Sequence, residues 1–372
     1  MEKVGCYIHI PFCEKKCYYC DFAAFSNLEG WIDGYINNLI KEIQMYRNNM
    51  DLAIDSIYIG GGTPSYIDDK YIKQIVEEIR KFPTDIKEFT IECNPNSINR
   101  HKLETYKKLG VTRISLGVQS FDDKVLKNIG RNHTSSIAIN DILLIKEFDF
   151  DLSFDLMLNL PGQDFDSVKK DLEMVKKLEP DHISWYSLIL DKGSLFYNLD
   201  QKGKLKLMDT DLEVDIFSFI VDELDKLGLS RYEISNFSRK NKESIHNKKY
   251  WNIDGYVSFG LAAAGFLSNA RYTNVRNFVK YDKLIKSGKY PIEAREFINF
   301  DEREKEYIIF KLREREGIDL ERFREKFGCD FLEKYQKSID KFKDQDFFEI
   351  NSHFSFTKKG MILSNEFFVE II

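Results

Sequence analysis

The 372-residue sequence contains few cysteines and no long apolar run. Six cysteines are too few to cross-link so long a chain, and three of them lie so close together that disulfides in short loops could not join them all. The longest run of small or apolar residues, "LAAAGFL", is too short to cross a bilayer, and the first residues show no signal peptide. These absences predict a cytoplasmic protein with at most peripheral contact with a membrane.

The sequence also lacks an excess of positive charge. It holds 55 Lys and Arg against 61 Asp and Glu, a formal net charge of −6, whereas a general nucleic-acid binder needs a basic face to neutralise phosphates. We therefore expect no nucleic-acid partner. The hydrophobic content of 43% and the aromatic content of 14% allow a large core, and the length suits one large domain with a smaller one.

Apolar, β-rich segments alternate along the chain with segments that have the apolar period of a helix. The candidate strands lie at residues 4–10, 55–60, 88–93, 113–118, 152–158 and 182–189. Strand-then-helix units of this kind, roughly thirty residues each, are typical of βαβ connections. They predict an α/β fold with a parallel sheet, either an open sheet or a partial (βα)6 barrel of the TIM type.

Polar and unusual residues gather where the candidate strands end. The close cysteines follow the first strand and the sequence "GGGTPS" follows the second. Glu92 ends the third strand, Gln119 ends the fourth, and Asp155 lies in the fifth. Since parallel barrels carry their chemistry on the loops after the strands, we expect these residues to form one site.

The chain divides into three parts by composition. Residues 1–235 hold the barrel pattern, and residues 236–298 form a polar linking region with the basic stretch "SRKNKESIHNKKYW". Residues 299–372 show charged helices and a hairpin, which predicts a smaller, mainly helical region with a winged-helix-like element. Since acidic residues outnumber basic ones from residue 301 onward, we expect a lid or packing role there instead of DNA binding.

Three thiols, Cys13, Cys17 and Cys20, form a C-x3-C-x2-C pattern with no fourth cysteine nearby. A structural zinc site needs four ligands, and His9 would be the nearest candidate for the fourth. His9, however, alternates with Ile8 and Ile10 as a strand residue does. Three thiolates on a 4Fe–4S cluster would leave one iron open for a substrate or cofactor, and we favour this interpretation over zinc or unligated thiols.

At this point the sequence shows a resemblance. "CEKKCYYC" resembles the cluster motif of the radical S-adenosylmethionine (SAM) enzymes. Together with "GGGTPS", "IECNPN", "SLGVQSFDDKVLKNIGRNH" and "DLMLNLPGQ", it is similar to the oxygen-independent coproporphyrinogen dehydrogenase (HemN) family and its heme-chaperone branch (HemW). The resemblance is strong over residues 4–290 and weaker beyond. It implies a partial (βα)6 barrel with smaller C-terminal elements, a 4Fe–4S cluster and bound SAM.

The resemblance also assigns candidate SAM contacts. SAM would chelate the open iron, and the backbone of Gly61 and Gly62 could approach its ammonium group closely because neither residue has a Cβ. Thr63 adjoins these glycines, and Glu92, Gln119 and Asp155 are polar groups suited to the ribose and adenine. Arg131 is a cation suited to the SAM carboxylate, and Tyr7 would place an aromatic ring against the cofactor.

Two features separate the branches of this family. The dehydrogenases extend the cluster motif with a further cysteine, and this sequence has Phe22 at that position. The stretch "HNKKYW" resembles the motif associated with heme binding in the chaperone branch, which makes His246 a candidate heme contact. The alternative interpretation of this stretch is a solvated basic loop in which His246 is hydrogen-bonded locally.

The sequence departs from the chaperone branch at one place. Where a histidine is expected in a glycine-rich stretch, "GLAAAGF" has Ala264. We still expect a radical SAM heme chaperone that delivers heme to apo-cytochromes, with no catalytic residue assigned. The alternatives are an oxygen-independent coproporphyrinogen III dehydrogenase, which decarboxylates propionate side chains, and a cluster-bearing protein with neither activity.

Overall fold

The computed structural model describes residues 1–371, and a twelve-stranded sheet dominates it. Six parallel strands form its centre in chain order, and each lies within a few residues of its predicted position. They are β1 (Glu2–Ile10), β2 (Leu52–Gly61), β3 (Thr84–Cys93), β4 (Arg113–Gln119), β5 (Asp151–Leu158) and β6 (His182–Ser187). The predicted α/β fold with a parallel sheet is confirmed.

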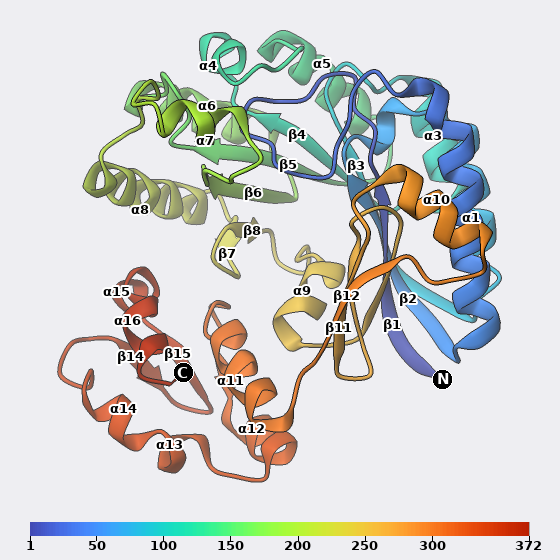
Figure 1. Ribbon diagram of the computed structural model, residues 1–372. Coiled ribbons are helices and arrows are strands. Elements are labelled where there is room, and N and C mark those ends of the chain that lie inside the picture. Colours follow the sequence, from blue (N-terminus) through green and yellow to red (C-terminus); the bar gives the residue numbers. More distant parts are fainter. Residues whose placement is uncertain (372) are drawn as a thin grey trace.

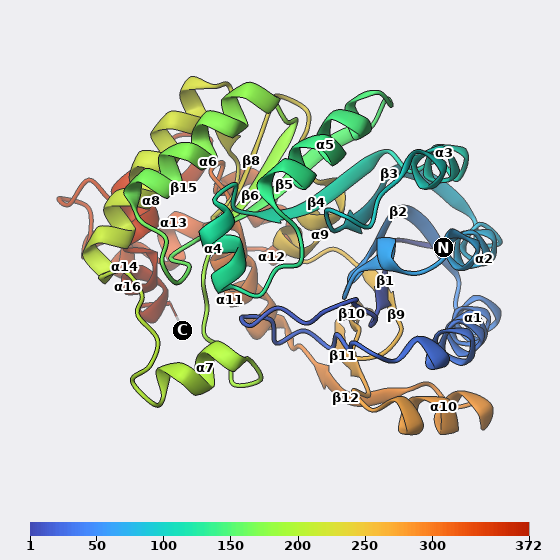
Figure 2. The same cartoon turned by 90° about the horizontal axis from the view of Figure 1, so that it is seen from above.

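Helices between these strands cover the outer face of the sheet, as Figures 1 and 2 show. They are α1 (Ile32–Asn49), α2 (Asp69–Ile79), α3 (Arg100–Lys108), α4 (Asp123–Asn128), α5 (Ser135–Lys146) and α6 (Phe165–Leu178). All but α1 begin after a side chain that accepts a hydrogen bond from the first turn, such as Asp68 before α2 and Asn99 before α3. Viewed from above, the strands follow an arc that stays open on one side (Figure 2).

Residues 236–298, which we expected to link two domains, contribute strands to both edges of the sheet. Beyond β6, β8 (Asn236–Ser238) pairs with β6, and β7 (Ser230–Arg231) pairs with β8. Beyond β1, β9 (Tyr256–Phe259) runs parallel to it and continues into three antiparallel strands. These are β10 (Ala264–Leu267), β11 (Ala270–Asn274) and β12 (Ile292–Phe297). The three-part division of the chain itself stays a prediction.

Four helices between residues 195 and 286 take different positions around the barrel. They are α7 (Leu195–Asp200), α8 (Thr210–Lys226), α9 (Ile245–Asn252) and α10 (Phe278–Lys286). The ring centroids of Tyr35 on α1 and Tyr281 on α10 are 5.6 Å apart, so α10 packs against α1. Within residues 1–371, no helix combines the length and the apolarity needed to cross a membrane.

The C-terminal part has a core of its own. Its helices are α11 (Phe300–Lys311), α12 (Leu320–Phe327), α13 (Phe331–Lys334), α14 (Gln336–Asp340), α15 (Lys358–Ile362) and α16 (Ser364–Val369). Its strands β13 (Ile318–Asp319), β15 (His353–Phe356) and β14 (Phe348–Ile350) form a small antiparallel sheet in that order. The predicted helical region with a hairpin is therefore present, and its phenylalanines pack between the helices and this sheet.

Candidate functional site

A cavity of about 390 Å³ opens at the carboxyl ends of the parallel strands. Its walls bring together the three thiols and most of the predicted SAM contacts. The predicted residues that line it are Cys13, Cys17, Cys20, Gly61, Gly62, Thr63, Glu92, Gln119, Arg131 and Asp155. Tyr7 and His246 are outside this lining. Residues far apart in the sequence therefore meet in one site because the strands that carry them are parallel neighbours.

The cysteine loop after β1 is held by backbone and side-chain contacts. The Cys13 amide donates to the Phe25 carbonyl over 2.9 Å, and the Thr63 hydroxyl donates to Cys13 Sγ over 3.3 Å. Arg131 Nη1 lies 3.4 Å from Cys17 Sγ. Burial raises the pKa of the Cys13 thiol and raises that of Cys20 to about 11, so binding of iron must displace their protons.

The donor set fits a 4Fe–4S cluster. Three thiols face one cavity, and thiolates are the ligands that such clusters use. Among residues 1–371, no three His, Cys, Asp or Glu side chains are gathered as ligands of a single metal ion. A cluster does not need such a group, because each thiolate binds a different iron. Cys93, at the end of β3, also lines the cavity, which the spacing of the motif did not reveal.

The glycines after β2 allow the cysteine loop to pack closely. Gly61 has a φ of +112°, and a Cβ there would lie 2.5 Å from the His9 ring. At Gly62 a Cβ would lie 2.8 Å from the Phe12 carbonyl oxygen. The Gly62 amide donates to the Ile10 carbonyl over 2.8 Å, which fixes the two loops together. The protein's own atoms therefore leave no room for a Cβ at these two positions, whether or not a ligand also approaches them.

Glu92 is a partly buried carboxyl group that lines the cavity. It accepts hydrogen bonds from the Tyr58 hydroxyl over 2.8 Å and from the Gly61 amide over 2.9 Å. Burial raises the pKa of Glu92 to about 7. Tyr58 also lines the cavity, and the sequence did not single it out because an aromatic residue on a strand usually belongs to the core. Tyr7 lies behind it, with the two ring centroids 6.0 Å apart.

Two further polar groups face the cavity from β5 and from the turn after β4. Asp155 accepts from the Ser115 hydroxyl over 3.1 Å, and burial raises its pKa. Gln119 has a φ of +69°, in the left-handed region that non-glycine residues rarely adopt. The turn at Gln119 therefore stores local strain, which is a common feature of binding sites.

Arg131 is a partly buried cation that also lines the cavity. Its Nη2 donates to Asn94 Oδ1 over 3.0 Å and to the Gly117 carbonyl, while its Nε has no hydrogen-bond partner. Asn94 also donates to Thr63 Oγ1 over 2.9 Å. Since buried donors rarely stay unpaired, the free Nε fits a site that takes an anionic ligand. Asn94 lines the cavity as well, and "IECNPN" was the signal that could have identified it.

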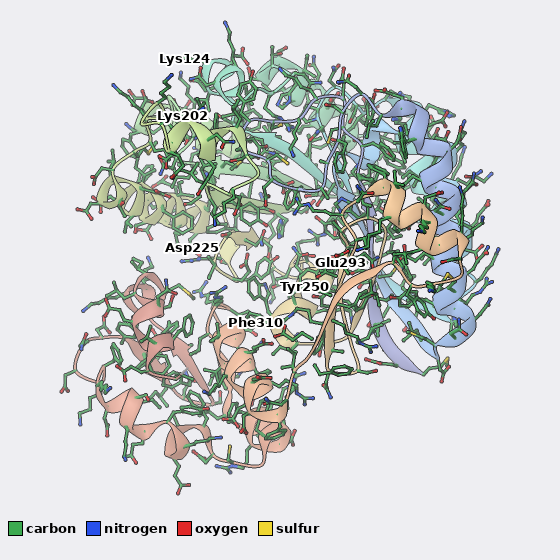
Figure 3. The ribbon with its side chains drawn as sticks, in the orientation of Figure 1. Lys124, Lys202, Asp225, Tyr250, Glu293 and Phe310 are labelled. Carbon is green, nitrogen blue, oxygen red and sulfur yellow. The ribbon has the colours of Figure 1, made fainter. Side chains whose placement is uncertain are left out.

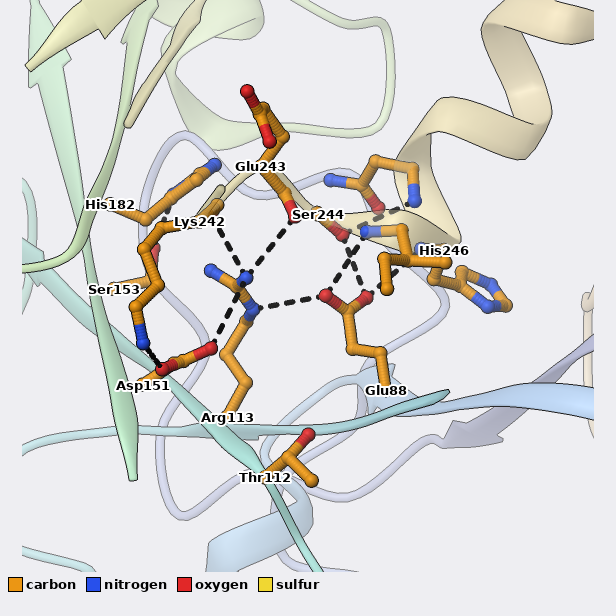
Figure 4. A network of polar contacts seen from close by, with 12 residues as sticks. Glu88, Thr112, Arg113, Asp151, Ser153, His182, Lys242, Glu243, Ser244 and His246 are labelled. Carbon is orange, nitrogen blue, oxygen red and sulfur yellow. Dashed lines mark hydrogen bonds and ion pairs between the residues drawn. The ribbon is translucent and has the colours of Figure 1, made fainter. Parts of the chain in front are cut away.

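The floor of the cavity carries a second polar network, shown in Figure 4. Arg113 Nε lies 3.2 Å from Glu88 Oε2, and Arg113 Nη2 lies 3.8 Å from Asp151 Oδ2. Glu88 also accepts from the Ser244 hydroxyl and from the amides of Ile245 and His246. The carboxylate thereby receives the free amides at the start of α9 and fixes this helix to the barrel.

His246 has no exposed surface in this arrangement. Its Nδ1 lies 3.0 Å from the Ser56 hydroxyl, and its Nε2 lies 2.9 Å from the Tyr250 hydroxyl. Burial lowers the pKa of His246 to about 3, so the ring is neutral. Both nitrogens are therefore occupied. The histidine predicted as a heme contact is buried here and could reach an iron only if α9 moved, and its role stays a prediction.

The basic stretch around His246 is also largely paired within the protein. Lys249 Nζ lies 2.8 Å from Asp55 Oδ2, and Lys242 forms an ion pair with Asp151. Arg239 donates to the carbonyls of Pro180 and Leu227. This stretch is therefore not the free cationic loop that the sequence indicated, because folding brings acidic residues and carbonyls of distant segments against it.

Comparisons with known proteins agree with this geometry. A family model described as the radical SAM superfamily matches residues 7–175, and one described as the HemN C-terminal domain matches residues 299–363. The chain is 33% identical over 368 residues to the heme chaperone HemW of Bacillus subtilis, covering 97% of each chain. It is 34% identical to the heme chaperone HemW of Lactococcus lactis, covering 98% of this chain and 96% of the relative.

Among solved structures, coproporphyrinogen III oxidase (HemN) from Escherichia coli has the same fold. The TM-score is 0.86 at 20% sequence identity, and the superposition covers 100% of this chain and 90% of the other. At that identity the likeness concerns the fold. It places the partial barrel and the C-terminal region in the same arrangement in both proteins.

Proposed function

The chain belongs to the radical SAM superfamily and, within its HemN-like group, to the HemW family. From this premise we propose that it binds a 4Fe–4S cluster, SAM and heme. We propose further that it delivers the heme to apo-cytochromes. The observation that carries the proposal is the single cavity in which three thiols and partly buried polar groups from successive strands meet. Heme is proposed as the cargo because these relatives are named heme chaperones.

The side chains of the cavity divide by the group that each would hold. Cys13, Cys17 and Cys20 would hold the cluster, which with SAM supplies one-electron cleavage to a 5′-deoxyadenosyl radical. Arg131 would donate its unpaired Nε to the SAM carboxylate. Glu92 and Asp155 would accept hydrogen bonds from SAM hydroxyl and amino groups, since both are partly buried carboxyl groups that face the cavity.

The second candidate function is oxygen-independent coproporphyrinogen III dehydrogenation. The shared fold with the Escherichia coli enzyme favours it. Phe22 argues against it, because an apolar ring stands where the dehydrogenases carry a further cysteine, and it can neither ligate a metal nor exchange a proton. Phe22 lines the cavity, so the substitution falls at the site itself.

One experiment separates the two functions. The protein is reconstituted anaerobically with iron and sulfide and then offered ferric heme and, separately, coproporphyrinogen III with SAM and a reductant. We expect binding of about one heme per chain and a rate of porphyrinogen decarboxylation no higher than in the cluster-free Cys17→Ala variant. Sustained decarboxylation without heme binding would replace the chaperone function with the dehydrogenase function.

A further inference from the structure

The outer part of the cavity carries apolar side chains that remain open to solvent. Phe22, in the loop after β1, is 64% exposed, and Ile189, in the loop after β6, is 72% exposed. Tyr186, near the end of β6, is 42% exposed and lines the same cavity. We call Phe22, Tyr186 and Ile189 the apolar wall. Because water solvates large apolar groups poorly, a group of them at the mouth of a cavity is typical of a ligand-binding face.

A second cavity, of about 710 Å³, adjoins the apolar wall. It shares Lys16, Asp21 and Asp191 with the first cavity, so the two cavities are continuous. We call the region around these shared residues, where the cavities meet the apolar wall, the mouth. Its volume lies within the range of roughly 300 to 1,000 Å³ that small molecules and cofactors occupy. In Figure 2 the loop after β1 and α7 border the open side of the barrel, and the Phe196 amide joins them through the Tyr18 carbonyl.

The mouth has an excess of positive charge. Its cations are Lys15, Lys16, Lys192 and Arg276, and its carboxylates are Asp21 and Asp191. The formal excess is therefore two positive charges. Within residues 1–371, Lys16 and Lys192 take part in no ion pair, and Arg276 donates to the Asp21 carbonyl. These cations are available to a ligand that carries two carboxylates.

We propose that heme docks at this mouth, with its ring against the apolar wall and its two propionates toward Lys16, Lys192 and Arg276. This inference rests on the proposed function, which supplies heme as the cargo. A planar macrocycle with two carboxylates on one edge matches an apolar wall bordered by cations, whereas His246 on α9 has no exposed surface and both of its ring nitrogens are hydrogen-bonded.

The mouth gives the iron no imidazole. In the described part of the chain, His182 is the histidine that lines these cavities, and it is buried at the floor. Its nitrogens face the Ser153 and Tyr232 hydroxyls over 2.8 Å each. Heme held at the mouth by apolar contact and charge alone would leave its iron open toward an accepting protein, as release of a cargo requires.

The test is a titration of the anaerobically reconstituted full-length protein with ferric heme, followed by absorbance. The variants are Phe22→Asp, the double variant Lys16→Glu with Lys192→Glu, and His246→Ala. The controls are Phe297→Asp, which replaces a phenylalanine that is 70% exposed on β12, and Lys108→Glu with Lys337→Glu, which reverses two exposed lysines elsewhere. Cluster content per chain verifies that each variant is folded.

We expect both mouth variants to raise the Kd for heme by about tenfold or more, because each removes a contact of that order. The wild-type Kd should rise with salt, and that of the lysine variant should depend on salt less, since exposed charges are screened over about 10 Å at 0.1 M. Wild-type binding with mouth variants that match their controls would overturn the site, and loss in His246→Ala alone would assign it to α9. A wild type that binds no heme would instead remove the proposed function and this site with it.

Discussion

At the scale of single residues, folding places the three thiols that would hold the proposed cluster in different surroundings. Cys13 is buried beside Thr63, whereas Cys17 and Cys20 are partly exposed near Arg131 and Lys16. Cys93 lines the same cavity from β3, and burial raises its pKa to about 12. The sequence assigned it no role because it is distant from the motif. Because Cys93 lines the cavity, it could be asked whether this thiol binds the fourth iron of the proposed cluster.

Replacing Cys13, Cys17 or Cys20 by Ala should abolish the cluster, and Cys93→Ala should keep it. Each of the first three would supply one iron ligand, while an open fourth iron needs no protein thiolate. Iron and sulfide content after anaerobic reconstitution measures the result, with Cys6→Ala as a control for loss of a buried thiol on β1. A cluster that fails to form in Cys93→Ala but forms in Cys6→Ala would contradict the open iron.

Glu92 should make SAM binding depend on pH. Its pKa is raised to about 7 by burial, so much of the free protein carries the neutral acid below that pH. If SAM hydroxyls donate to the carboxylate, binding favours the ionised form, and affinity should rise as the pH increases through 7. We expect a Kd about tenfold weaker at pH 6 than at pH 8.

Equilibrium dialysis with SAM at several pH values measures this dependence. Glu92→Gln keeps the shape of the side chain and removes its titration, so its profile should be weaker overall and flatter. An equally steep profile in the glutamine variant would show that another group titrates with SAM.

At the scale of elements, α9 depends on a single carboxylate of β3. Glu88 receives Arg113 Nε and three donors from the start of the helix, all over 2.9 to 3.2 Å. Arg113 and Glu88 are both buried, so each would be costly without the other. The same contacts keep His246 between Ser56 and Tyr250, which explains why a motif that looks exposed in the sequence is enclosed in the fold.

Glu88→Ala should lower the free energy of unfolding by about 3 to 5 kcal/mol, because it removes the nearer of the two carboxylates beside the buried Arg113 charge and leaves only the 3.8 Å contact with Asp151. Glu147→Ala is the matched control, since it removes an exposed ion pair with Arg100 and should change stability by less than about 1 kcal/mol. Urea denaturation of the cluster-free proteins, followed by circular dichroism, measures both. Equal losses in the two variants would contradict the role of Glu88 in holding α9.

At the scale of the whole molecule, the C-terminal part docks on the barrel through α9 and α11. The rings of Trp251 and Phe310 are 6.0 Å apart, and Lys311 Nζ lies 3.1 Å from Asn252 Oδ1. Figure 3 shows Tyr250 and Phe310 at this junction, where they border a cavity of about 330 Å³. The two parts have separate cores, and further polar contacts join them, such as the ion pair between Arg271 and Glu306 over 3.0 Å and the hydrogen bond from the Arg315 amide to the Tyr232 carbonyl over 2.9 Å.

Phe310→Asp should loosen this docking without unfolding either core, because it places a charge against Trp251 and the junction cavity. Limited proteolysis should then cut near residue 299 several times faster than in the wild type, while cluster content stays the same. Phe297→Asp, close by on β12 and already exposed, should be cut at the wild-type rate. Loss of the cluster in Phe310→Asp would show that the two parts fold as one unit.

Much of the barrel was predictable from the sequence. The six central strands lie where the apolar pattern placed them, since a buried parallel strand must be apolar along its length. The cysteine motif predicted that three thiols meet in one site, because they are neighbours in the chain, and all three line the cavity. Glu92, Gln119 and Asp155 were assigned to one site for a general reason: the ends of adjacent parallel strands meet at one edge.

Tertiary structure alone decided what lies against these residues. His246 meets Ser56 across 190 positions of sequence, and Lys249 meets Asp55 across 194, so no local pattern could show that this histidine is enclosed and this lysine is paired. Likewise, Phe22 and Ile189 form one apolar wall only because the loops after β1 and β6 end at the same mouth. Sequence periodicity reports which face of an element is buried, whereas contacts between distant segments depend on how the chain closes on itself.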